Sequence, residues 1–426
     1  MESGAAVESY AELPLSQVDP VVSRLVAGEL ERQQTYIEMI ASENFTPRAV
    51  LEAVGSVLTN KYAEGLPGAR YYHGCQVVDQ VETVAIERAK ALYGAGHANV
   101  QPHSGAQANQ AAYVAAVPSG ATIMSMRLDH GGHLTHGLKV NFSGRTYNFV
   151  HYALSKATGC IDYDQVRTLA LEARPRLIVA GASSYPRFID FAALRQIADE
   201  VGAELMVDMA HIAGLVAAGV HPTPFGHAQW VTTTTHKTLA GPRGGTVFCE
   251  AENATKLDRA VFPGSQGGPL EHVIAGKAVC FLLANTEEFR EKQRRTVVNA
   301  AALAEVLLAA GLKLVTGGTD NHIVLVDFIG QEMTGLRAAD LLHEVGITAN
   351  KNTVPGDDRP PTVTSGLRLG TPAMTTRGFG VEETREVGRI IAEALTTATT
   401  EARRESLRRR CLELSQAHPL YRCLSA

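Results

Sequence analysis

The feature that most constrains the fold is a regular alternation of short apolar runs with amphipathic helical patterns between residues 78 and 249. The strand-like runs are residues 121–126, 176–180, 205–207, 230–235 and 246–249. The helical patterns are residues 78–93, 106–117, 163–173 and 191–201. Such alternation is typical of βαβ units, in which helices connect parallel strands. We therefore expect an α/β fold with a large, doubly wound and mostly parallel sheet.

The pattern changes after Pro269. Two long helical patterns, residues 271–293 and 297–310, precede short strands at residues 313–315, 322–327 and 366–369 and a helix at residues 338–345. This order predicts a smaller α+β domain at the C-terminus. We expect an N-terminal arm and helix over residues 1–45, a large domain over residues 46–284 and a small C-terminal domain over residues 285–426.

The N-terminal region predicts an arm followed by one helix. Residues 1–18 are mostly small and polar, which favours a loose arm. Asp19-Pro20 predicts a helix start, because Asp is a good N-cap and Pro is favoured at the first helical position. The positions that follow give this helix one apolar stripe, made of Val22, Leu25, Val26 and Leu30.

The composition favours a globular protein and excludes several other classes. Hydrophobic residues make up 45% and charged residues 19% of the 426 residues, and the net charge is -5. No long Lys/Arg run appears outside Arg408-Arg409-Arg410, which argues against a nucleic-acid partner. No apolar run suits a membrane span, and no signal-peptide pattern is present. Six cysteines without a CxxC pair or zinc spacing predict reduced thiols, so we expect a cytoplasmic protein.

One lysine stands at the end of a predicted strand. Residues 228–235 favour extended backbone because they contain Trp230, Val231 and four consecutive threonines, and Lys237 follows closely. Burial at such a place disfavours the ammonium form and makes the amine available as a nucleophile. Lys237 therefore suits Schiff-base chemistry, and the alternative is a solvated lysine beside a hairpin.

An acidic residue ends the preceding predicted strand. Asp208 follows residues 205–207 and lies one βαβ step before Lys237. The carboxyl ends of strands in open α/β sheets are where ligands bind. Asp208 could cap the next helix, or it could pair with the protonated ring nitrogen of pyridoxal phosphate and keep that ring an electron sink.

Three other segments suit anions. Ser104 and Gly105 begin a predicted helix, whose first amides and positive end would form a phosphate cup. The glycine-rich loop at residues 264–268 could also bring amides to an anion. Arg368 lies on an apolar strand between glycines and is either a clamp for a substrate carboxylate or part of an internal salt bridge.

The segment at residues 129–136 carries His130, His133 and His136 at three-residue steps. A metal site is one interpretation. Gly131 and Gly132 interrupt the helix that would align these side chains, and no carboxylate spacing supports a metal. We therefore expect no metal, and a histidine stacked on a flat cofactor ring fits this loop better.

Seven motifs stand together in this chain: Ala41-Ser42-Glu43-Asn44, Asn60-Lys61-Tyr62-Ala63-Glu64-Gly65, Gln101-Pro102-His103-Ser104-Gly105, Gly131-Gly132-His133-Leu134-Thr135-His136-Gly137, Val207-Asp208-Met209-Ala210-His211, Thr233-Thr234-Thr235-His236-Lys237-Thr238 and residues 364–372. With them the chain resembles the serine hydroxymethyltransferases, a family of fold-type-I pyridoxal-phosphate enzymes, from about Asp19 onward.

The resemblance implies which residues bind the cofactor. They are Lys237, Ser104, Gly105, His133, Ser183, Asp208, His211, His236 and Gly268. Lys237 would carry pyridoxal 5'-phosphate as a Schiff base, Asp208 would hold the ring nitrogen, and His133 would stack on the ring. His211 and Ser183 would bond near the ring hydroxyl. The others would line the phosphate, with Gly268 supplied by a partner subunit.

The resemblance also implies the residues that bind substrate, namely Ser42, Tyr62, Glu64, Tyr72, Arg368 and Asn352. Arg368 and Ser42 would grip the amino-acid carboxylate, and Asn352 resembles a folate contact. Tyr62, Glu64 and Tyr72 would come from the neighbouring subunit, with Glu64 managing a proton. The implied catalytic residues are Lys237, Glu64, Tyr72, His133 and Asp208.

The implied reaction interconverts serine and glycine by cleaving the Cα–Cβ bond, with tetrahydrofolate as the one-carbon carrier. The family's sites are shared between subunits, so the resemblance implies a homodimer or a dimer of dimers acting on small molecules.

Two departures from the family's pattern leave alternatives open. This chain has Tyr71-Tyr72-His73-Gly74-Cys75-Gln76 where the family usually has Tyr-Tyr-Gly-Gly-Cys-Glu, and Gly356-Asp357-Asp358 where an Asn often follows Val-Pro. His73 would lie at the mouth of the site. An α-methylserine hydroxymethyltransferase, with alanine as the acceptor, or a threonine-type aldolase is therefore the alternative within this fold. A silent scaffold or a metal hydrolase built on the histidine loop is the alternative outside it.

Overall fold

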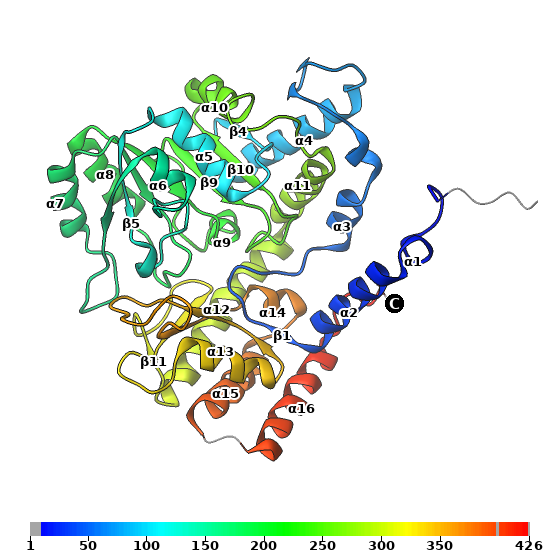
Figure 1. Ribbon diagram of the computed structural model, residues 1–426, viewed down its shortest axis with the longest axis vertical. Coiled ribbons are helices and arrows are strands. Elements are labelled where there is room, and N and C mark those ends of the chain that lie inside the picture. Colours follow the sequence, from blue (N-terminus) through cyan, green and yellow to red (C-terminus); the bar gives the residue numbers. More distant parts are fainter. Residues whose placement is uncertain (1–9, 398–399, 425–426) are drawn as a thin grey trace, which may run out of the picture.

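The computed structural model describes residues 10–397 and 400–424 (Figure 1). Its larger sheet has seven strands in the order β4-β10-β9-β8-β7-β5-β6. They are β4 (His97–Asn99), β5 (Thr122–Met126), β6 (Asn148–Tyr152), β7 (Leu177–Ala180), β8 (Glu204–Asp208), β9 (Trp230–Thr234) and β10 (Gly245–Cys249). Strand β10 runs opposite to the other six strands of this sheet. The predicted α/β fold with a mostly parallel sheet is therefore confirmed.

Helices cover both faces of this sheet, which explains why its central strands are apolar throughout. Along β7, Ile178 and Ala180 pack into a core shared with α4 (Gln76–Tyr93), α7 (Tyr163–Ala173), α8 (Phe191–Val201) and α11 (Glu271–Ala284). Leu177 and Val179 pack into the opposite core with α5 (Gly105–Ala116) and α10 (Ala254–Val261). Alternate side chains of a strand point to opposite faces, so a strand buried on both faces is continuously hydrophobic.

A second, four-stranded antiparallel sheet follows in the C-terminal part, in the order β11-β12-β15-β14. Its strands are β11 (Lys313–Leu314), β12 (Ile323–Asp327), β14 (Asn350–Asn352) and β15 (Gly366–Gly370). It shares a separate core with α12 (Glu287–Ala309), α13 (Gly335–Glu344), α15 (Val381–Thr396) and α16 (Glu401–Ala417). This is the smaller α+β part that the sequence predicts. The boundaries at residues 45/46 and 284/285 stay predictions.

The remaining elements connect or flank these layers. They are α1 (Leu15–Val18), α2 (Pro20–Thr35), β1 (Ile37–Glu38), α3 (Arg48–Val54), η1 (Val57–Asn60), β2 (Gly65–Leu66), β3 (Ala69–Arg70), η2 (Leu128–His130), α6 (Phe142–Thr146), α9 (Ala213–Ala217), η3 (Ala251–Asn253), β13 (Ile347–Thr348) and α14 (Pro372–Arg377). Strand β1 pairs with β13, so the chain that follows α2 joins the C-terminal half. No helix among the described residues combines the length and apolar character that crossing a membrane requires.

Two sequence expectations about helices are wrong in detail. The patterns at residues 271–293 and 297–310 do not divide near residue 295. The first helix, α11, ends at Ala284, and α12 begins at Glu287 because the Thr286 hydroxyl caps it by accepting from the Phe289 amide. The predicted N-terminal arm lies partly in residues 1–9, outside the described residues, and residues 15–18 form the short helix α1.

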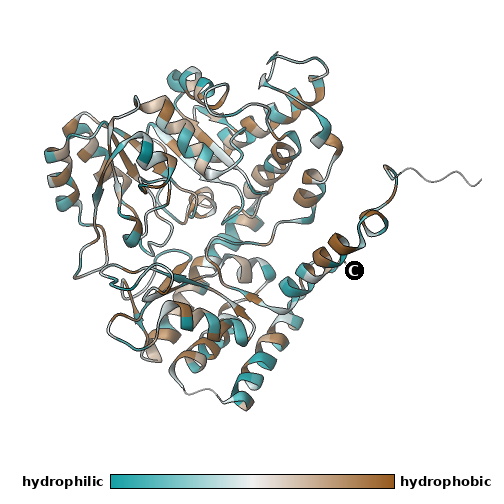
Figure 2. Ribbon diagram, viewed as in Figure 1, coloured by the Kyte–Doolittle hydropathy of each residue, from teal (hydrophilic) through white to brown (hydrophobic). Residues whose placement is uncertain are grey.

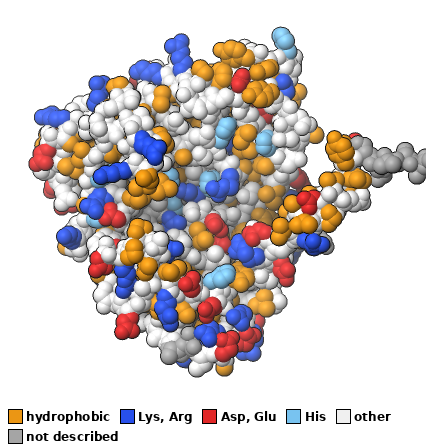
Figure 3. Space-filling view, viewed as in Figure 1, with side chains coloured by type: hydrophobic (Ala, Val, Ile, Leu, Met, Phe, Trp, Pro, Cys, Tyr) orange, Lys and Arg blue, Asp and Glu red, His pale blue; other side chains and the backbone are white. Residues whose placement is uncertain are grey.

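Helix α2 begins as predicted, with the Asp19 carboxylate accepting from two backbone amides. Its apolar stripe is nevertheless exposed, with Leu25 68% and Val26 59% accessible. The helix projects from the body of the molecule (Figure 1), brown residues run along it in Figure 2, and hydrophobic side chains gather on the same projection in Figure 3. Within one chain, this helix face has little to pack against.

A close backbone approach holds the ends of two neighbouring strands. Gly181 follows β7 with φ +112°, and a Cβ there would lie 2.0 Å from the backbone oxygen of Asp208 at the end of β8. Only glycine permits both this conformation and this approach. The position of Asp208 therefore depends on Gly181.

We expect Gly181→Ala to destabilise the protein much more than Gly219→Ala. Gly219 also has a positive φ, +71°, but open space around it. Alanine at this position therefore lowers the free energy of unfolding only by the ~1–2 kcal/mol that a left-handed backbone costs. Gly181→Ala adds a steric term of about 2 kcal/mol. Urea unfolding midpoints of both variants measure the difference. Equal losses would show that the contact with Asp208 does not constrain the fold.

Candidate active site

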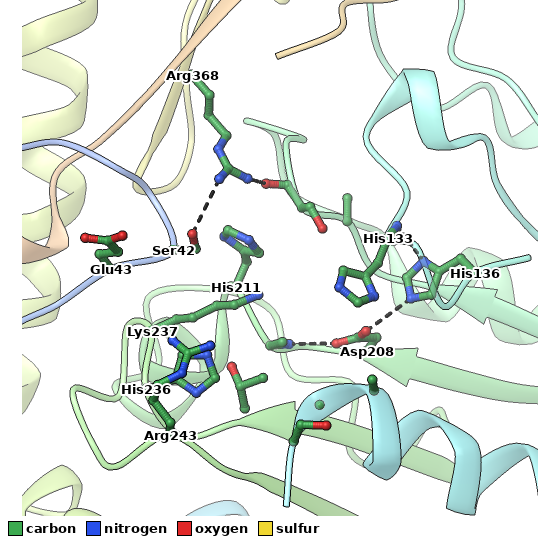
Figure 4. A pocket seen from close by; sticks show the side chains of 17 residues that line it. Ser42, Glu43, His133, His136, Asp208, His211, His236, Lys237, Arg243 and Arg368 are labelled. Carbon is green, nitrogen blue, oxygen red and sulfur yellow. Dashed lines mark hydrogen bonds and ion pairs between the residues drawn. The ribbon is translucent and has the colours of Figure 1, made fainter. Parts of the chain in front are cut away.

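A cavity of about 500 Å³ opens at the carboxyl ends of the central parallel strands (Figure 4). Residues from both sheets and from the chain after β1 line it: Ser42, Glu43, Ser104, Gly105, Ala106, His133, His136, Ala182, Ser183, Asp208, Ala210, His211, Thr234, His236, Lys237, Arg243 and Arg368. This is the edge at which open α/β sheets bind ligands. Ten of the residues predicted from sequence meet here: Ser42, Ser104, Gly105, His133, Ser183, Asp208, His211, His236, Lys237 and Arg368.

Asp208 is the last residue of β8 and is held by several donors. Its Oδ2 accepts from Asn109 at 2.9 Å and lies 3.1 Å from Nε2 of His136, while Oδ1 accepts from the Ala210 amide at 3.1 Å. Burial alone would raise the pKa of Asp208, but His136 and the other donors hold it well below its usual range. Asp208 is therefore a fixed carboxylate. It does cap the next backbone turn, as the simpler interpretation expects, yet it also faces the cavity.

Lys237 follows β9 by three residues and points into the same cavity. Strands β8 and β9 are parallel neighbours, with Asp208 opposite Thr232, so the two residues meet as predicted. The backbone around Lys237 is fixed, because Asn44 donates to its carbonyl at 3.0 Å. Burial lowers the pKa of Lys237 to about 8, with Asp208 raising it and Arg368 and Arg243 lowering it. Most of this side chain is therefore still an ammonium at neutral pH, but its free amine is far more populated than in an ordinary lysine.

The start of α5 forms a cradle suited to an anion. The Ser104 hydroxyl caps the helix by accepting from the Gln107 amide, and Gly105 and Ala106 line the cavity in the first turn. The approach is close, because a Cβ at Gly105 would lie 2.6 Å from Cγ2 of Thr234. First-turn amides and the positive end of a helix attract anions.

Arg368, on β15, reaches the cavity without an acidic partner. Its guanidinium donates to the Ser183 carbonyl at 2.6 Å, to Asn350 at 3.2 Å and to the Ser42 hydroxyl at 3.4 Å. None of these partners is a carboxylate, so an internal salt bridge of Arg368 is not observed among the described residues. Burial lowers the pKa of Arg368 to about 10, with Glu43 acting in the opposite direction, and the side chain stays cationic at neutral pH. A buried arginine that is hydrogen-bonded only to neutral groups suits a ligand carboxylate.

The histidine loop lies beside Asp208. His133, His136 and Asp208 come close enough to hold a metal ion, so the fold supplies the carboxylate that the sequence spacing lacked. The carboxylate is already engaged by His136 and Asn109. Burial lowers the pKa of His133 to about 4, so this ring is neutral and can lie against a flat ligand.

Four predicted residues lie elsewhere, in a second cluster of Tyr62, Glu64, Tyr72 and Gly268. The rings of Tyr62 and Tyr72 are 5.2 Å apart, and the Tyr62 hydroxyl lies 3.4 Å from Glu64. Gly268 packs against the Tyr62 ring. None of the four lines the cavity of its own chain. Asn352 also lies outside the lining but donates to Ser184, the neighbour of Ser183.

Sequence reasoning assigned no role to Glu43, His136 or Arg243, which also line the cavity. Each of them lies in the sequence near a residue that was predicted to belong to the site. Glu43 adjoins Ser42, His136 is the last histidine of the loop, and Arg243 follows Lys237 in a Gly-Pro-Arg-Gly-Gly segment. Periodicity alone could not show that these side chains converge.

The comparison with known families agrees with this geometry. A family model described as serine hydroxymethyltransferase matches residues 15–391. The chain belongs to the serine hydroxymethyltransferase family. A serine hydroxymethyltransferase of Kocuria rhizophila is 58% identical over 419 residues, which cover 97% of this chain and 98% of that protein. One of Kineococcus radiotolerans is 59% identical over 413 residues, 96% of this chain and 94% of that protein. The serine hydroxymethyltransferase resemblance predicted from the motifs is confirmed.

We expect Asp208→Asn to lower the pKa of Lys237 below about 8, because the carboxylate raises it. The measurement is the pH dependence of Lys237 modification by an amine reagent in cofactor-free protein, read by peptide mass spectrometry. Asp164→Asn is the control, since this carboxylate is 93% exposed and is not part of the cavity lining. An unchanged midpoint of Lys237 modification in Asp208→Asn would show that the Asp208 carboxylate does not act on the Lys237 amine.

Proposed function

We propose that this protein is a pyridoxal-phosphate-dependent enzyme that interconverts serine and glycine, with tetrahydrofolate as the one-carbon carrier. The observation that carries the proposal is the meeting of Lys237, the fixed carboxylate of Asp208 and the unpaired Arg368 in one cavity. Family membership and two relatives named serine hydroxymethyltransferase support the same activity.

The residues present fit pyridoxal phosphate at each of its functional groups. An aldehyde suits the amine of Lys237, a phosphate suits the first turn of α5 beside His236, and a protonated ring nitrogen suits Asp208. His133, neutral through burial, suits the ring face, and His211 and Ser183 suit its hydroxyl. When bound, the cofactor supplies an electron-accepting ring for the electron pair at the substrate's α-carbon.

The other end of the cavity suits the amino acid. The Arg368 guanidinium offers two parallel N–H donors that match a carboxylate, and Ser42 lies 3.4 Å from it. Because Arg368 contacts Ser183 and Asn350 as well, its orientation is fixed before substrate arrives. Fixing the carboxylate orients the α-carbon bonds relative to the ring, which favours cleavage of one of them.

We propose a homodimer or a dimer of dimers in which the cluster of Tyr62, Glu64, Tyr72 and Gly268 completes the partner's cavity. Two observations support this. The cluster is exposed, with Tyr62 56% and Tyr72 46% accessible, although it carries residues that suit catalysis. The apolar stripe of α2 is exposed too. In the completed cavity, Glu64 would exchange a proton with the hydroxyl group of the substrate, and Asn352 would contact the folate. We also propose that the protein is located in the cytoplasm.

The comparisons do not favour the alternative with alanine as acceptor or the aldolase, because the relatives are named serine hydroxymethyltransferase. His73 is exposed, and the left-handed backbone of its loop falls on Gly74 at φ +76°. The histidine therefore adds no backbone strain beside Tyr72.

We expect borohydride reduction of the purified protein with bound cofactor to place the covalent adduct on Lys237. The reason is that Lys237, whose pKa is lowered to about 8, lines the cavity together with Asp208. Peptide mass spectrometry identifies the modified lysine. An adduct on Lys277, the other lysine with a strongly lowered pKa, would refute the assignment.

We expect Arg368→Lys to raise the Michaelis constant for serine at least tenfold, about 1.4 kcal/mol, because a point charge cannot reproduce bidentate geometry. Arg377→Lys is a matched control. Arg377 is equally buried, burial lowers its pKa to about 10 as well, and it donates only to backbone carbonyls away from the cavity. Equal Michaelis constants in the two variants would make Arg368 a structural residue.

A further inference from the structure

A buried histidine outside the cavity, His322, contacts the cavity histidine His211. Its Nε2 lies 3.4 Å from Nδ1 of His211. The ring planes are inclined by only 16°, and the ring centroids are 5.6 Å apart. Because the centroids are much farther apart than the nitrogens, the rings meet edge to edge. The two nitrogens therefore share one in-plane N–H···N hydrogen bond.

The surrounding fold fixes the position of His322. It directly precedes β12, and its carbonyl accepts from the Thr371 amide at 3.2 Å. The adjacent Asn321 donates to the Tyr185 carbonyl at 3.0 Å. Asn321 thus ties this segment to the loop after β7, and His322 itself is completely buried. A ring placed so rigidly can orient its neighbour.

Both rings are neutral. Burial lowers the pKa of His322 to about 3, helped by the cations Arg368 and Lys237. Burial also holds the pKa of His211 well below its ordinary value, with Lys237 and Arg368 acting in the same direction. A neutral imidazole has one donor and one acceptor nitrogen. The proton position on one ring therefore decides the role of each nitrogen in the pair.

The ring nitrogen of His322 that faces away from His211 selects the arrangement. Nδ1 of His322 has no hydrogen-bond partner within the described part of the chain. A buried N–H without an acceptor is rarer in proteins than a buried acceptor without a donor, so the proton of His322 belongs on Nε2. Nε2 of His322 then donates to Nδ1 of His211, and Nε2 of His211 carries the proton toward the cavity that His211 lines.

We propose that His322 is a positioning residue that fixes the tautomer of His211, so that His211 presents a hydrogen-bond donor to the group bound in the cavity. The inference deepens the proposed function and rests on it, because the ring oxygen of the cofactor is an acceptor that such a donor fits.

The direct test is nitrogen NMR of the full-length protein containing ¹⁵N-histidine, with and without bound cofactor. His211→Asn assigns the His211 signals. We expect Nε2 of His211 to carry the proton and Nδ1 to be unprotonated near neutral pH. A proton on Nδ1, or exchange between the two tautomers, would overturn the proposal. This readout does not depend on catalysis, so it remains valid even where the proposed activity fails.

Variants of His322 separate positioning from stability. His322→Leu removes both nitrogens, whereas His322→Gln retains an N–H donor for His211. His221→Leu is the control, because His221 is also buried, at 5% exposure, and lies outside the cavity.

We expect His322→Leu to lower kcat about tenfold, the effect typical of a residue that orients a functional imidazole. The serine KM should change little, and the pH midpoint of the bound cofactor's absorption should shift. His322→Gln should restore most of kcat and keep the His211 tautomer, and His221→Leu should change neither readout.

Equal losses in His322→Leu and His322→Gln, or an equal loss in His221→Leu, would overturn the proposal. Where His322→Leu does not fold, the His211 tautomer in the wild type and in His322→Gln decides.

Discussion

The site depends on one electrostatic arrangement, the fixed carboxylate of Asp208 at the end of β8 and the amine of Lys237 just beyond the neighbouring strand β9. A carboxylate in such surroundings would take up a proton without donors, and His136 and Asn109 prevent this. Asn109 is itself fixed because Thr232 of β9 donates to its carbonyl at 2.6 Å. The helix α5 and the histidine loop therefore converge on the carboxylate of Asp208, and β9 supports it through Asn109. Burial meanwhile lowers the pKa of Lys237 to about 8, so the site combines a charged acid with an available base.

Three buried histidines near this pair, His133, His236 and His322, contribute dipoles rather than charges at neutral pH. Burial lowers the pKa of His133 to about 4 and those of His236 and His322 to about 3, against an ordinary value of 6.5. The folded protein consequently binds fewer protons at these rings than the unfolded chain does between about pH 6.5 and pH 3. Stability contributed by these rings is thus retained above pH 6.5 and falls as the pH is lowered through that window. The cations of the cavity are Lys237, Arg243 and Arg368, and they outnumber the carboxylates Glu43 and Asp208. This excess suits a ligand that brings its own anionic groups.

Much of this arrangement could be predicted from local sequence, and the rest depends on long-range packing. Apolar strands followed by polar residues predicted the sheet and the meeting of Asp208 with Lys237, because parallel strands end at one edge. The short strands β4 and β6 lacked a clear apolar run, and the division between α11 and α12 depends on a single threonine cap. The histidine spacing gave no sign that Asp208 would join His133 and His136, since 72 residues separate Asp208 from His136. The contact between His211 and His322 spans 111 residues and brings together the two sheets, so no local pattern could reveal it.

A crystal structure of the protein grown with pyridoxal phosphate tests the account most directly, because its central claim assigns each wall of one cavity to one group of the cofactor. We predict continuous density between Nζ of Lys237 and the cofactor, the ring nitrogen hydrogen-bonded to Asp208, and the phosphate at the first turn of α5. A cofactor bound with its phosphate at Arg368, or a ring nitrogen remote from Asp208, would contradict the account.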